Sequence, residues 1–271
     1  MRAVLTIAGS DCSGGAGIQA DLKTITAYGM YGMSVITALT AQNTRGVYAV
    51  SETPKDMLRG QLEAVFSDIM PEAVKIGLLP SRAAALLVSE FLLQYRPAYV
   101  VIDPVMASAS GCRFMNQDTI TAAGENLFEK ASLLTPNVPE ALALLEGERH
   151  REHLESRAET EKAALALQTR YRTAVLLKGG HQAGGADDCL AADGNLYWFE
   201  GERIHARGSH GTGCTLSAAI ACGLAAGHGL EEAVRQAKRY VTGALQNAPG
   251  LGGGNGPLNH CFTIPEAGRI F

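Results

Sequence analysis

The segment Gly208–Thr215 has the composition of a loop that holds a negatively charged group. Gly211 and Gly213 allow a ligand to approach the backbone closely, and a helix of small residues is predicted to begin at Thr212. The free amides at the start of that helix would face the ligand. The segment therefore predicts an anion cradle, of the kind that stabilises a phosphoryl group during its transfer.

Cys214 stands inside this segment, at the start of the predicted helix. Thiol pKa values fall at helix N-termini and thiolate character rises, which indicates a reactive cysteine. A buried structural cysteine is the alternative, because free cysteine is among the most buried residue types. The surrounding glycines favour a functional role.

A second glycine-rich segment, Gly9–Gly17, follows the first predicted strand and opens a helix. Its backbone amides are expected to receive polar or anionic ligand groups, although a tight turn between strand and helix is the alternative. The glycine spacing does not match the dinucleotide-binding fingerprint, and the chain has no Walker GK[ST] motif. Asp21, one turn into the helix, would face a ligand over the loop or stabilise the positive helix end.

Polar residues also follow several later strands. Asp103 ends one predicted strand, Asn137 and Glu140 follow the next, and Lys178 follows the one after. Singly, each is more often a cap, a turn or a salt bridge. Together at the carboxyl edge of one sheet they favour a site for Mg²⁺ and nucleotide phosphates. Gln42, just past the second predicted strand, offers an amide to the edge of a heterocycle, or forms a surface turn.

These residues require a sheet with helical connections. Apolar runs typical of strands occur at 3–8, 33–39, 73–76, 98–102, 132–134 and 174–177. Helix-like periodicity occurs at 18–28, 54–68, 82–95, 119–129, 139–145, 160–170, 212–226 and 230–247. The alternation predicts one α/β domain over residues 1–271, with a mostly parallel sheet and helices on both faces. Runs at 189–192 and 196–199 flank a turn and predict a small antiparallel hairpin.

The composition is that of a globular enzyme. Of 271 residues, 46% are hydrophobic and 18% charged, which excludes disorder. A net charge of −4 gives no attraction to nucleic acid or anionic membranes, so neither is an expected partner. The six cysteines lack CxxC spacing and the histidines lack metal-ligand spacing, so we expect a reducing cytoplasm and no zinc or iron site. Neither a signal peptide nor a membrane-spanning segment is expected.

The longest motifs resemble a known family. They lie at 8–11, 13–24, 35–39, 41–44, 75–77 and 210–215. In this order they are similar to the bacterial hydroxymethylpyrimidine/phosphomethylpyrimidine kinases of thiamine biosynthesis, over essentially the whole chain. The resemblance implies a ribokinase-like fold, usually dimeric. It also implies MgATP-dependent phosphorylation of a pyrimidine alcohol and then of the resulting monophosphate.

The resemblance also implies roles by position. Gly9, Asp21 and Gln42 correspond to pyrimidine contacts, Gly211, Thr212, Gly213 and Cys214 to the anion hole, Lys178 to a contact with the ATP phosphates, and Asp103, Asn137 and Glu140 to residues that order Mg²⁺ and its waters. Many related sugar kinases carry an aspartate base where this chain has Cys214. A thiol or thiolate would therefore accept the proton in the first phosphorylation, whereas the second acceptor is already an anionic phosphate oxygen.

Three rival functions are compatible with parts of the sequence. A vitamin B6 kinase would phosphorylate pyridoxal or pyridoxine, whose hydroxymethyl-bearing ring has a similar shape. A non-catalytic homologue would bind the pyrimidine without turnover, but it would not need the anion cradle together with the predicted phosphate and metal residues. A Rossmann-type oxidoreductase is disfavoured by the glycine spacing.

Overall fold

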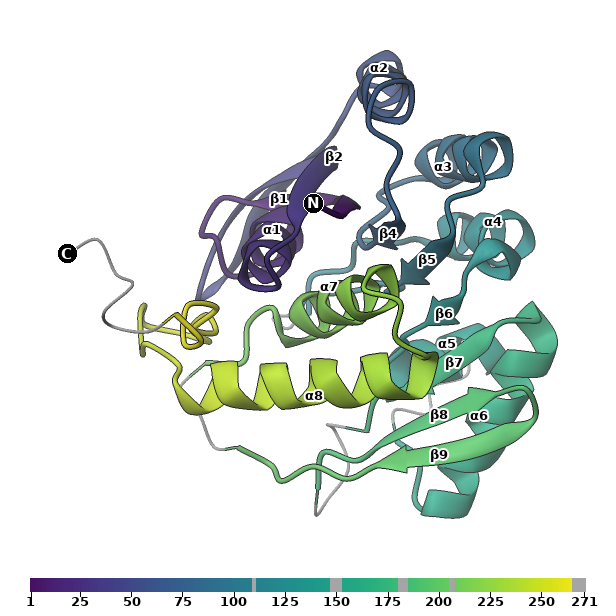
Figure 1. Ribbon diagram of the computed structural model, residues 1–271, viewed down its shortest axis with the longest axis vertical. Coiled ribbons are helices and arrows are strands. Elements are labelled where there is room, and N and C mark those ends of the chain that lie inside the picture. Colours follow the sequence, from purple (N-terminus) through teal and green to yellow (C-terminus); the bar gives the residue numbers. More distant parts are fainter. Residues whose placement is uncertain (109–110, 147–152, 180–184, 205–207, 265–271) are drawn as a thin grey trace.

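The computed structural model describes residues 1–108, 111–146, 153–179, 185–204 and 208–264 (Figure 1). Its strands are β1 (Ala3–Asp11), β2 (Tyr31–Asn43), β3 (Gly46–Glu52), β4 (Ala73–Ile76), β5 (Tyr99–Ile102), β6 (Leu133–Leu134), β7 (Ala174–Leu177), β8 (Asp188–Ala192) and β9 (Asn195–Phe199). Its helices are α1 (Gly17–Ala27), α2 (Lys55–Phe66), α3 (Arg82–Tyr95), α4 (Gln117–Asn126), α5 (Val138–Glu146), α6 (Arg157–Tyr171), α7 (Thr212–Ala225) and α8 (Leu230–Gln246), with a 3₁₀ turn at Phe128–Lys130.

The strands of the described residues form a single sheet, in the order β3-β2-β1-β4-β5-β6-β7-β8-β9. The six strands from β2 to β7 run parallel, and β3, β8 and β9 pair antiparallel at the two edges. In the centre, Ile7 of β1 lies between Val35 of β2 and Ile76 of β4. All three side chains are fully buried, as expected for parallel strands covered on both faces.

Two hydrophobic cores cover the two faces of the sheet. One contains residues of α2, α3, α4, α5 and α6, among them Leu62, Val88 and Leu167. The other contains residues of α1, α7 and α8, among them Ile25 and Ile220. Helix α7 is apolar almost all round and is buried from Thr215 to Ala225, because it lies between the sheet and α8. The N-terminal turn of this buried helix is thereby held at the carboxyl edge of the sheet.

The predicted α/β architecture, mostly parallel sheet and β8–β9 hairpin are confirmed. The sequence prediction missed a second antiparallel pair, because β3 was not recognised. In β3 the residues Tyr48–Glu52 are all exposed, so its pattern lacks the buried alternate positions that identify a strand. Strand β2 consequently runs further than expected and ends at Asn43, which places Gln42 inside the strand rather than past it.

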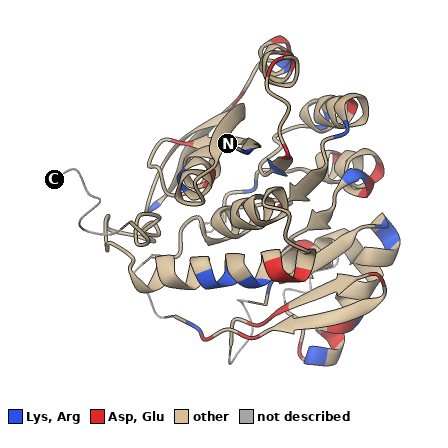
Figure 2. Ribbon diagram, viewed as in Figure 1, with Lys and Arg blue, Asp and Glu red and all other residues tan. Residues whose placement is uncertain are grey.

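Charges of both signs are interspersed over the outer helices (Figure 2). The first turn of α8 contains Glu231 and Glu232, and Arg235 forms an i, i+4 ion pair with the first and an i, i+3 ion pair with the second. Acidic residues in a first helical turn and i, i+4 pairs of this kind stabilise exposed helices modestly. Within the described residues, no helix has the length and apolarity needed to cross a membrane.

Candidate active site

The predicted site residues gather at the carboxyl edge of the parallel strands. Asp103 directly follows β5, Asn137 follows β6 and Lys178 follows β7, and these three strands are neighbours in the sheet. An isolated bridge between Asn137 and Lys178 extends the pairing of β6 with β7. The strand order reverses between β1 and β4, and open α/β sheets bind ligands outside the carboxyl ends near such a reversal.

Lys178 and Asp103 form an ion pair at this edge. Lys178 Nζ lies 2.7 Å from Asp103 Oδ1, which also accepts a hydrogen bond of 3.1 Å from Thr135 Oγ1. Burial alone would lower the pKa of Lys178, but the carboxylates of Asp103 and Glu140 outweigh it and raise that pKa. The side chain keeps 15% of its surface exposed, so a permanently charged ammonium remains accessible at the edge.

Glu140 is held by a reciprocal cap at the start of α5. Its Oε2 accepts from the Asn137 amide at 2.8 Å, and Asn137 Oδ1 accepts from the Glu140 amide at 2.9 Å. This capping box fixes both side chains. Burial, reinforced by Asp103 and opposed by Lys178, raises the pKa of Glu140 to about 7. Two carboxylates and a lysine therefore share one poorly hydrated corner.

The anion loop, residues Gly208–Cys214, lies directly against this corner. A Cβ atom on Gly213 would stand 3.3 Å from both Asp103 Oδ2 and Lys178 Nζ, so a side chain here would crowd the ion pair. Gly211 has a φ of +87°, and a Cβ there would lie 1.9 Å from the Gly15 carbonyl oxygen. Thr212 Oγ1 donates to Ser209 O at 2.7 Å and closes the turn. The loop thus presents the N-terminus of α7 to the Asp103–Lys178 pair.

Cys214 differs from the sequence expectation in its acidity. Burial raises its pKa to about 11, although the neighbouring Lys75 acts in the opposite direction, and Asp21 and Asp103 raise it further. The prediction of thiolate character was therefore wrong. The N-terminus of α7 does lower thiol pKa values in general, but here the loss of hydration and two nearby carboxylates dominate. At neutral pH Cys214 is a thiol.

Asp21 belongs to a fully buried polar group beneath the anion loop. Its carboxylate oxygens lie 2.9 and 2.8 Å from Lys75 Nζ, and its Oδ2 accepts a 2.6 Å hydrogen bond from Thr6 Oγ1. Neither Asp21 nor Lys75 has any exposed side-chain surface. The predicted contact of Asp21 with substrate stays a prediction. Lys75 was not among the predicted site residues, although a lysine inside the apolar strand Ala73–Ile76 was a signal that could have identified it.

The first glycine-rich loop is organised by its own aspartate. Asp11 Oδ1 accepts from the amide and hydroxyl of Ser13, and Oδ2 accepts from the amides of Gly15 and Ala16 at 3.1 and 2.8 Å. The expectation that these amides receive an anionic ligand was wrong, because the Asp11 carboxylate already occupies them. Gly9 is tightly packed, since a Cβ on it would lie 2.8 Å from Leu78 Cδ2. Its contact with substrate remains a prediction.

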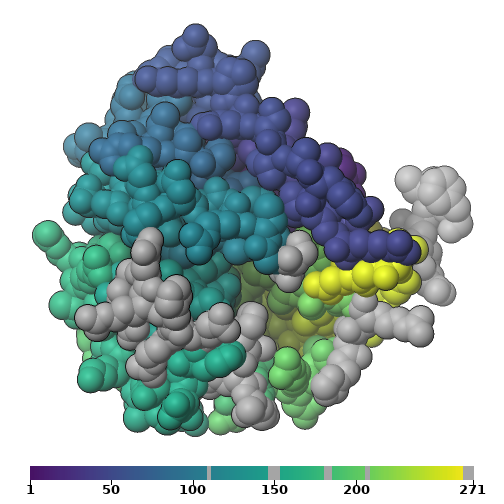
Figure 3. Space-filling view, turned by 180° about the vertical axis from the view of Figure 1, so that it is seen from behind, coloured from purple at the N-terminus to yellow at the C-terminus, as the bar shows by residue number. Residues whose placement is uncertain are grey.

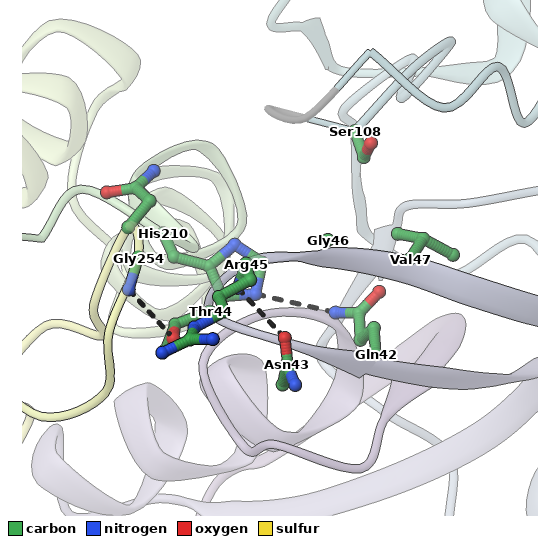
Figure 4. Close-up of a pocket in the computed structure, with 10 residues that line it drawn as sticks. Gln42, Asn43, Thr44, Arg45, Gly46, Val47, Ser108, His210 and Gly254 are labelled. Atoms are coloured by element: carbon green, nitrogen blue, oxygen red, sulfur yellow. Dashed lines mark hydrogen bonds between the residues drawn. The ribbon is translucent and has the colours of Figure 1, made fainter.

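A cavity of about 390 Å³ opens beside these loops (Figure 4). It is lined by the end of the β2–β3 hairpin (residues 42–47), by Ser108, by His210 of the anion loop and by Gly254 and Asn255. The hairpin is held to the C-terminal segment by hydrogen bonds from the Asn255 and Gly254 amides to Thr44, and Figure 3 shows the two segments in contact. Among the predicted substrate contacts, Gln42 faces this cavity.

The segment that follows Lys178 is described as far as Gly179 and again from residue 185. Gly179 donates its amide to Asp188 Oδ1 at 3.0 Å, and a Cβ on Gly179 would lie 1.9 Å from the Asp187 carbonyl oxygen. His181, which follows in the same sequence motif, lies outside the described residues. The backbone beside Lys178 is therefore anchored on the start of β8.

Comparison with known proteins gives a consistent result. The family model described as phosphomethylpyrimidine kinase matches residues 11–259. A hydroxymethylpyrimidine/phosphomethylpyrimidine kinase of Streptomyces coelicolor is 44% identical over 97% of this chain and 96% of its own length. A thiamine biosynthesis bifunctional protein of Geobacter sulfurreducens is 45% identical, and this chain spans 53% of it.

Solved structures agree with these sequences. The phosphomethylpyrimidine kinase of Clostridium difficile is 42% identical, with a TM-score of 0.78 over 89% of this chain and 98% of that one. The pyridoxal kinase of Staphylococcus aureus, solved with AMP-PCP and pyridoxal, is 33% identical, with a TM-score of 0.88 over 98% of this chain and 96% of that one. These neighbours share the ribokinase-like fold.

Proposed function

Because the chain belongs to the phosphomethylpyrimidine kinase family, we propose that it transfers the γ-phosphoryl group of ATP to 4-amino-5-hydroxymethyl-2-methylpyrimidine. The monophosphate is then phosphorylated again, to the diphosphate used in thiamine biosynthesis. The observation that best supports this proposal is that the Lys178–Asp103 pair lies directly against the first turn of α7. A Cβ atom on Gly213 would stand 3.3 Å from both Lys178 Nζ and Asp103 Oδ2. A cation and a free helix N-terminus meet there, which suits a transferring phosphoryl group.

The chain's own residues supply positive charge where negative charge is transferred. Lys178 neutralises phosphate oxygens, and the amides of Gly213 and Cys214, in the first turn of α7, receive the developing charge on the transferred group. Both are present before ATP arrives, because Asp103 fixes the ammonium and the glycines fix the loop. Asn137 and Glu140 hold each other through the capping box. Asn137 therefore lies at the same corner as Asp103 and Lys178.

The corner also fits a divalent cation. Mg²⁺ prefers carboxylate oxygens together with waters and phosphate oxygens, and Asp103 and Glu140 bring two carboxylates to one buried place. Their mutual repulsion is among the causes that raise the pKa of Glu140, and a cation between them would relieve it. When bound, Mg²⁺ would add positive charge to the ATP phosphates.

Cys214 acts in the first phosphorylation. The acceptor of that step is a neutral hydroxyl group, and a thiol near it can both donate and accept a weak hydrogen bond. In our proposal the Cys214 thiol orients the hydroxyl group, and the small thiolate fraction of Cys214 is the base that accepts the hydroxyl proton and becomes the thiol. The second acceptor is an anionic phosphate oxygen, which has no proton to lose, so Cys214 matters less there.

Two further properties complete the proposal. We expect the enzyme to act in the cytoplasm. We also expect a homodimer, in which a second copy covers the exposed apolar side chains of the β2–β3 hairpin. Leu39, Tyr48 and Val50 are 57%, 68% and 42% exposed there, and β3 is an edge strand of the sheet formed by the described residues, of the kind that proteins usually cover. Analytical ultracentrifugation of the wild type and of a Tyr48→Glu variant tests this, since the variant should shift toward the monomer.

The activity is tested by incubating the purified protein with MgATP and one acceptor at a time, and measuring ADP release. The acceptors are the pyrimidine alcohol, its monophosphate and pyridoxal. Release with both pyrimidines, at a higher kcat/KM than with pyridoxal, would support the proposal. Release with pyridoxal alone would instead favour a vitamin B6 kinase, and no release with any acceptor would favour a binding protein.

A further inference from the structure

A short C-terminal segment, residues 252–257, joins two parts of the candidate site that are distant in the chain. On one side it meets the tip of the β2–β3 hairpin. There the Asn255 amide donates to Thr44 O at 2.8 Å, and the Gly254 amide donates to Thr44 Oγ1 at 3.2 Å (Figure 4). On the other side it meets the start of the anion loop. None of the roles proposed above uses this segment.

Asn255 makes the contact with the anion loop through its side chain. Its Oδ1 atom accepts from the Ser209 amide at 2.6 Å and from Ser209 Oγ at 3.2 Å. Ser209 O in turn accepts from Thr212 Oγ1 at 2.7 Å, in the turn that begins α7. Beside it, the His210 amide donates to Gly256 O at 3.1 Å. Asn255 is therefore bonded to the hairpin through its backbone and to the anion loop through its side chain.

The segment fits closely against both of its neighbours. A Cβ atom on Gly254 would lie 2.1 Å from Thr44 O, and one on Gly208, at the start of the anion loop, would lie 2.3 Å from Gly256 O. Backbone meets backbone at both contacts, so neither contact can adjust by turning a side chain. The segment therefore fixes the distance between the hairpin and the anion loop.

The partners of Asn255 also determine which of its side-chain atoms matters. A backbone N–H group only donates hydrogen bonds, so the atom that faces the Ser209 amide must be the side-chain oxygen. Aspartate would keep an oxygen at this place. Alanine would remove it, and the Ser209 amide would lose this acceptor while the backbone bond from Asn255 to Thr44 stays.

The distance between hairpin and loop matters for phosphoryl transfer. In the proposed function the hairpin contacts the pyrimidine through Gln42, and the anion loop receives the transferred group. The acceptor oxygen and the γ-phosphoryl group must meet roughly in line, and a misplacement of about 1 Å can lower the rate by about 10²-fold. Each half of the site can bind its own ligand without this alignment.

We propose that Asn255 is a positioning residue that holds the anion loop at a fixed distance from the β2–β3 hairpin, so that the acceptor and the transferred phosphoryl group are aligned. This inference rests on the proposed function. Both phosphorylations use the same loop and the same hairpin, so both depend on Asn255. Cys214 differs in this respect, because its role belongs to the first step.

The test compares Asn255→Ala with Asn259→Ala, which removes a second asparagine side chain close by. Asn259 Oδ1 accepts from the Cys261 amide at 3.0 Å, outside the anion loop. We expect Asn255→Ala to lower the single-turnover rate about tenfold, with both the alcohol and the monophosphate. The dissociation constants of the alcohol and of the ATP analogue AMP-PCP, each measured alone by calorimetry, should change by less than about twofold. Asn259→Ala should keep the wild-type rates.

Two further variants separate positioning from general damage. Asn255→Asp keeps the oxygen that accepts from Ser209 and should restore part of the rate. Gly254→Ala leaves every polar side chain of the segment in place but puts a methyl group against Thr44 O. It should therefore slow both transfers even if Asn255→Ala does not fold.

Several results would overturn the inference. One is an unchanged rate in both Asn255→Ala and Gly254→Ala, and others are an equal loss in Asn259→Ala or no recovery in Asn255→Asp. A loss that disappears at saturating ligand would also overturn it, because Asn255 would then contact the ligand directly. Failure of the wild type to phosphorylate the pyrimidine alcohol would instead overturn the proposed function, so the two failures are distinguishable.

Discussion

Lys178 Nζ lies 2.7 Å from Asp103 Oδ1, although 75 residues separate them in the chain. Such an ion pair does not by itself indicate a function, because lysine–aspartate pairs are common on protein surfaces. In the proposed function the pair matters because of its place, at the carboxyl ends of β5 and β7 and next to Gly213 in the first turn of α7. The cation is held by one carboxylate while 15% of its side-chain surface stays accessible, which is the arrangement that an incoming phosphate requires.

Replacing Cys214 by serine should separate the two phosphorylations. The first step loses the group that helps to remove a hydroxyl proton, and general-base assistance is typically worth a factor of roughly 10² or more. The second step, to a phosphate oxygen, should fall by far less. Single-turnover rates with the alcohol and with the monophosphate provide the comparison. Equal losses in both steps would refute this division of roles.

The raised pKa of Cys214 predicts that this cysteine is alkylated slowly. With a pKa of about 11, only about one molecule in 10³ carries the thiolate at pH 8, so Cys214 should react slowly with iodoacetamide. The exposed Cys12 and Cys261 should be modified first. Peptide mapping by mass spectrometry over pH 7–10 measures each rate. Modification of Cys214 at pH 7 as fast as that of the exposed cysteines would show that the burial argument is incorrect.

The buried pair of Asp21 and Lys75 should be more sensitive to losing one partner than to losing both charges. Lys75→Met leaves an unpaired buried carboxylate, which typically costs about 3–5 kcal/mol of stability. Adding Asp21→Asn removes that charge, keeps an acceptor for Thr6 and should recover part of the loss. Urea unfolding followed by the fluorescence of Trp198, the single tryptophan, gives the free energies.

A surface pair provides the control for this experiment. Arg59 and Glu90 form a bidentate but exposed ion pair, and exposed pairs contribute little to stability. Arg59→Met should therefore change the unfolding free energy much less than Lys75→Met does. If the Lys75→Met and Asp21→Asn losses simply add, the two residues do not act as the buried pair described above.

His260 should make stability depend on pH. Its Nε2 atom lies 2.9 Å from Thr215 Oγ1, and burial lowers its pKa from 6.5 to about 4. Between these values the unfolded chain binds the proton and the folded chain does not, so stability falls as the pH drops. The full loss, by pH 4, is about 3 kcal/mol. Unfolding free energies at pH 7 and pH 5 should differ more for the wild type than for His260→Gln, and equal differences would count against this assignment.

Much of the fold was predictable from local patterns. The strands Ala73–Ile76 and Ala174–Leu177 and the helix Arg82–Tyr95 begin and end where the sequence predicted, because buried parallel strands and amphipathic helices have clear apolar periods. Edge strand β3 was missed for the opposite reason, since most of its side chains are exposed. Its partner strand was in turn predicted too short.

The sequence predicted which side chains lie together at the candidate site better than it predicted their pKa values and hydrogen bonds. Asp103, Glu140 and Lys178 could be placed together from their positions after successive strands. The internal hydrogen bonds of Asp11 were missed, although an aspartate just before a glycine-rich turn often bonds to nearby amides. The raised pKa of Cys214 and the partner of Lys75 depend on burial and on contacts distant in sequence, and local patterns contain neither.

The most direct test of the account is a time course of the products formed from the pyrimidine alcohol and MgATP, followed by mass spectrometry, with wild-type enzyme and with Lys178→Met. We predict that the wild type forms first the monophosphate and then the diphosphate. Lys178→Met should slow both steps by at least about 10²-fold, because both transfers use the same cation, while the protein stays folded. Formation of both products by Lys178→Met at the wild-type rate, or no phosphorylation by the wild type, would contradict the account.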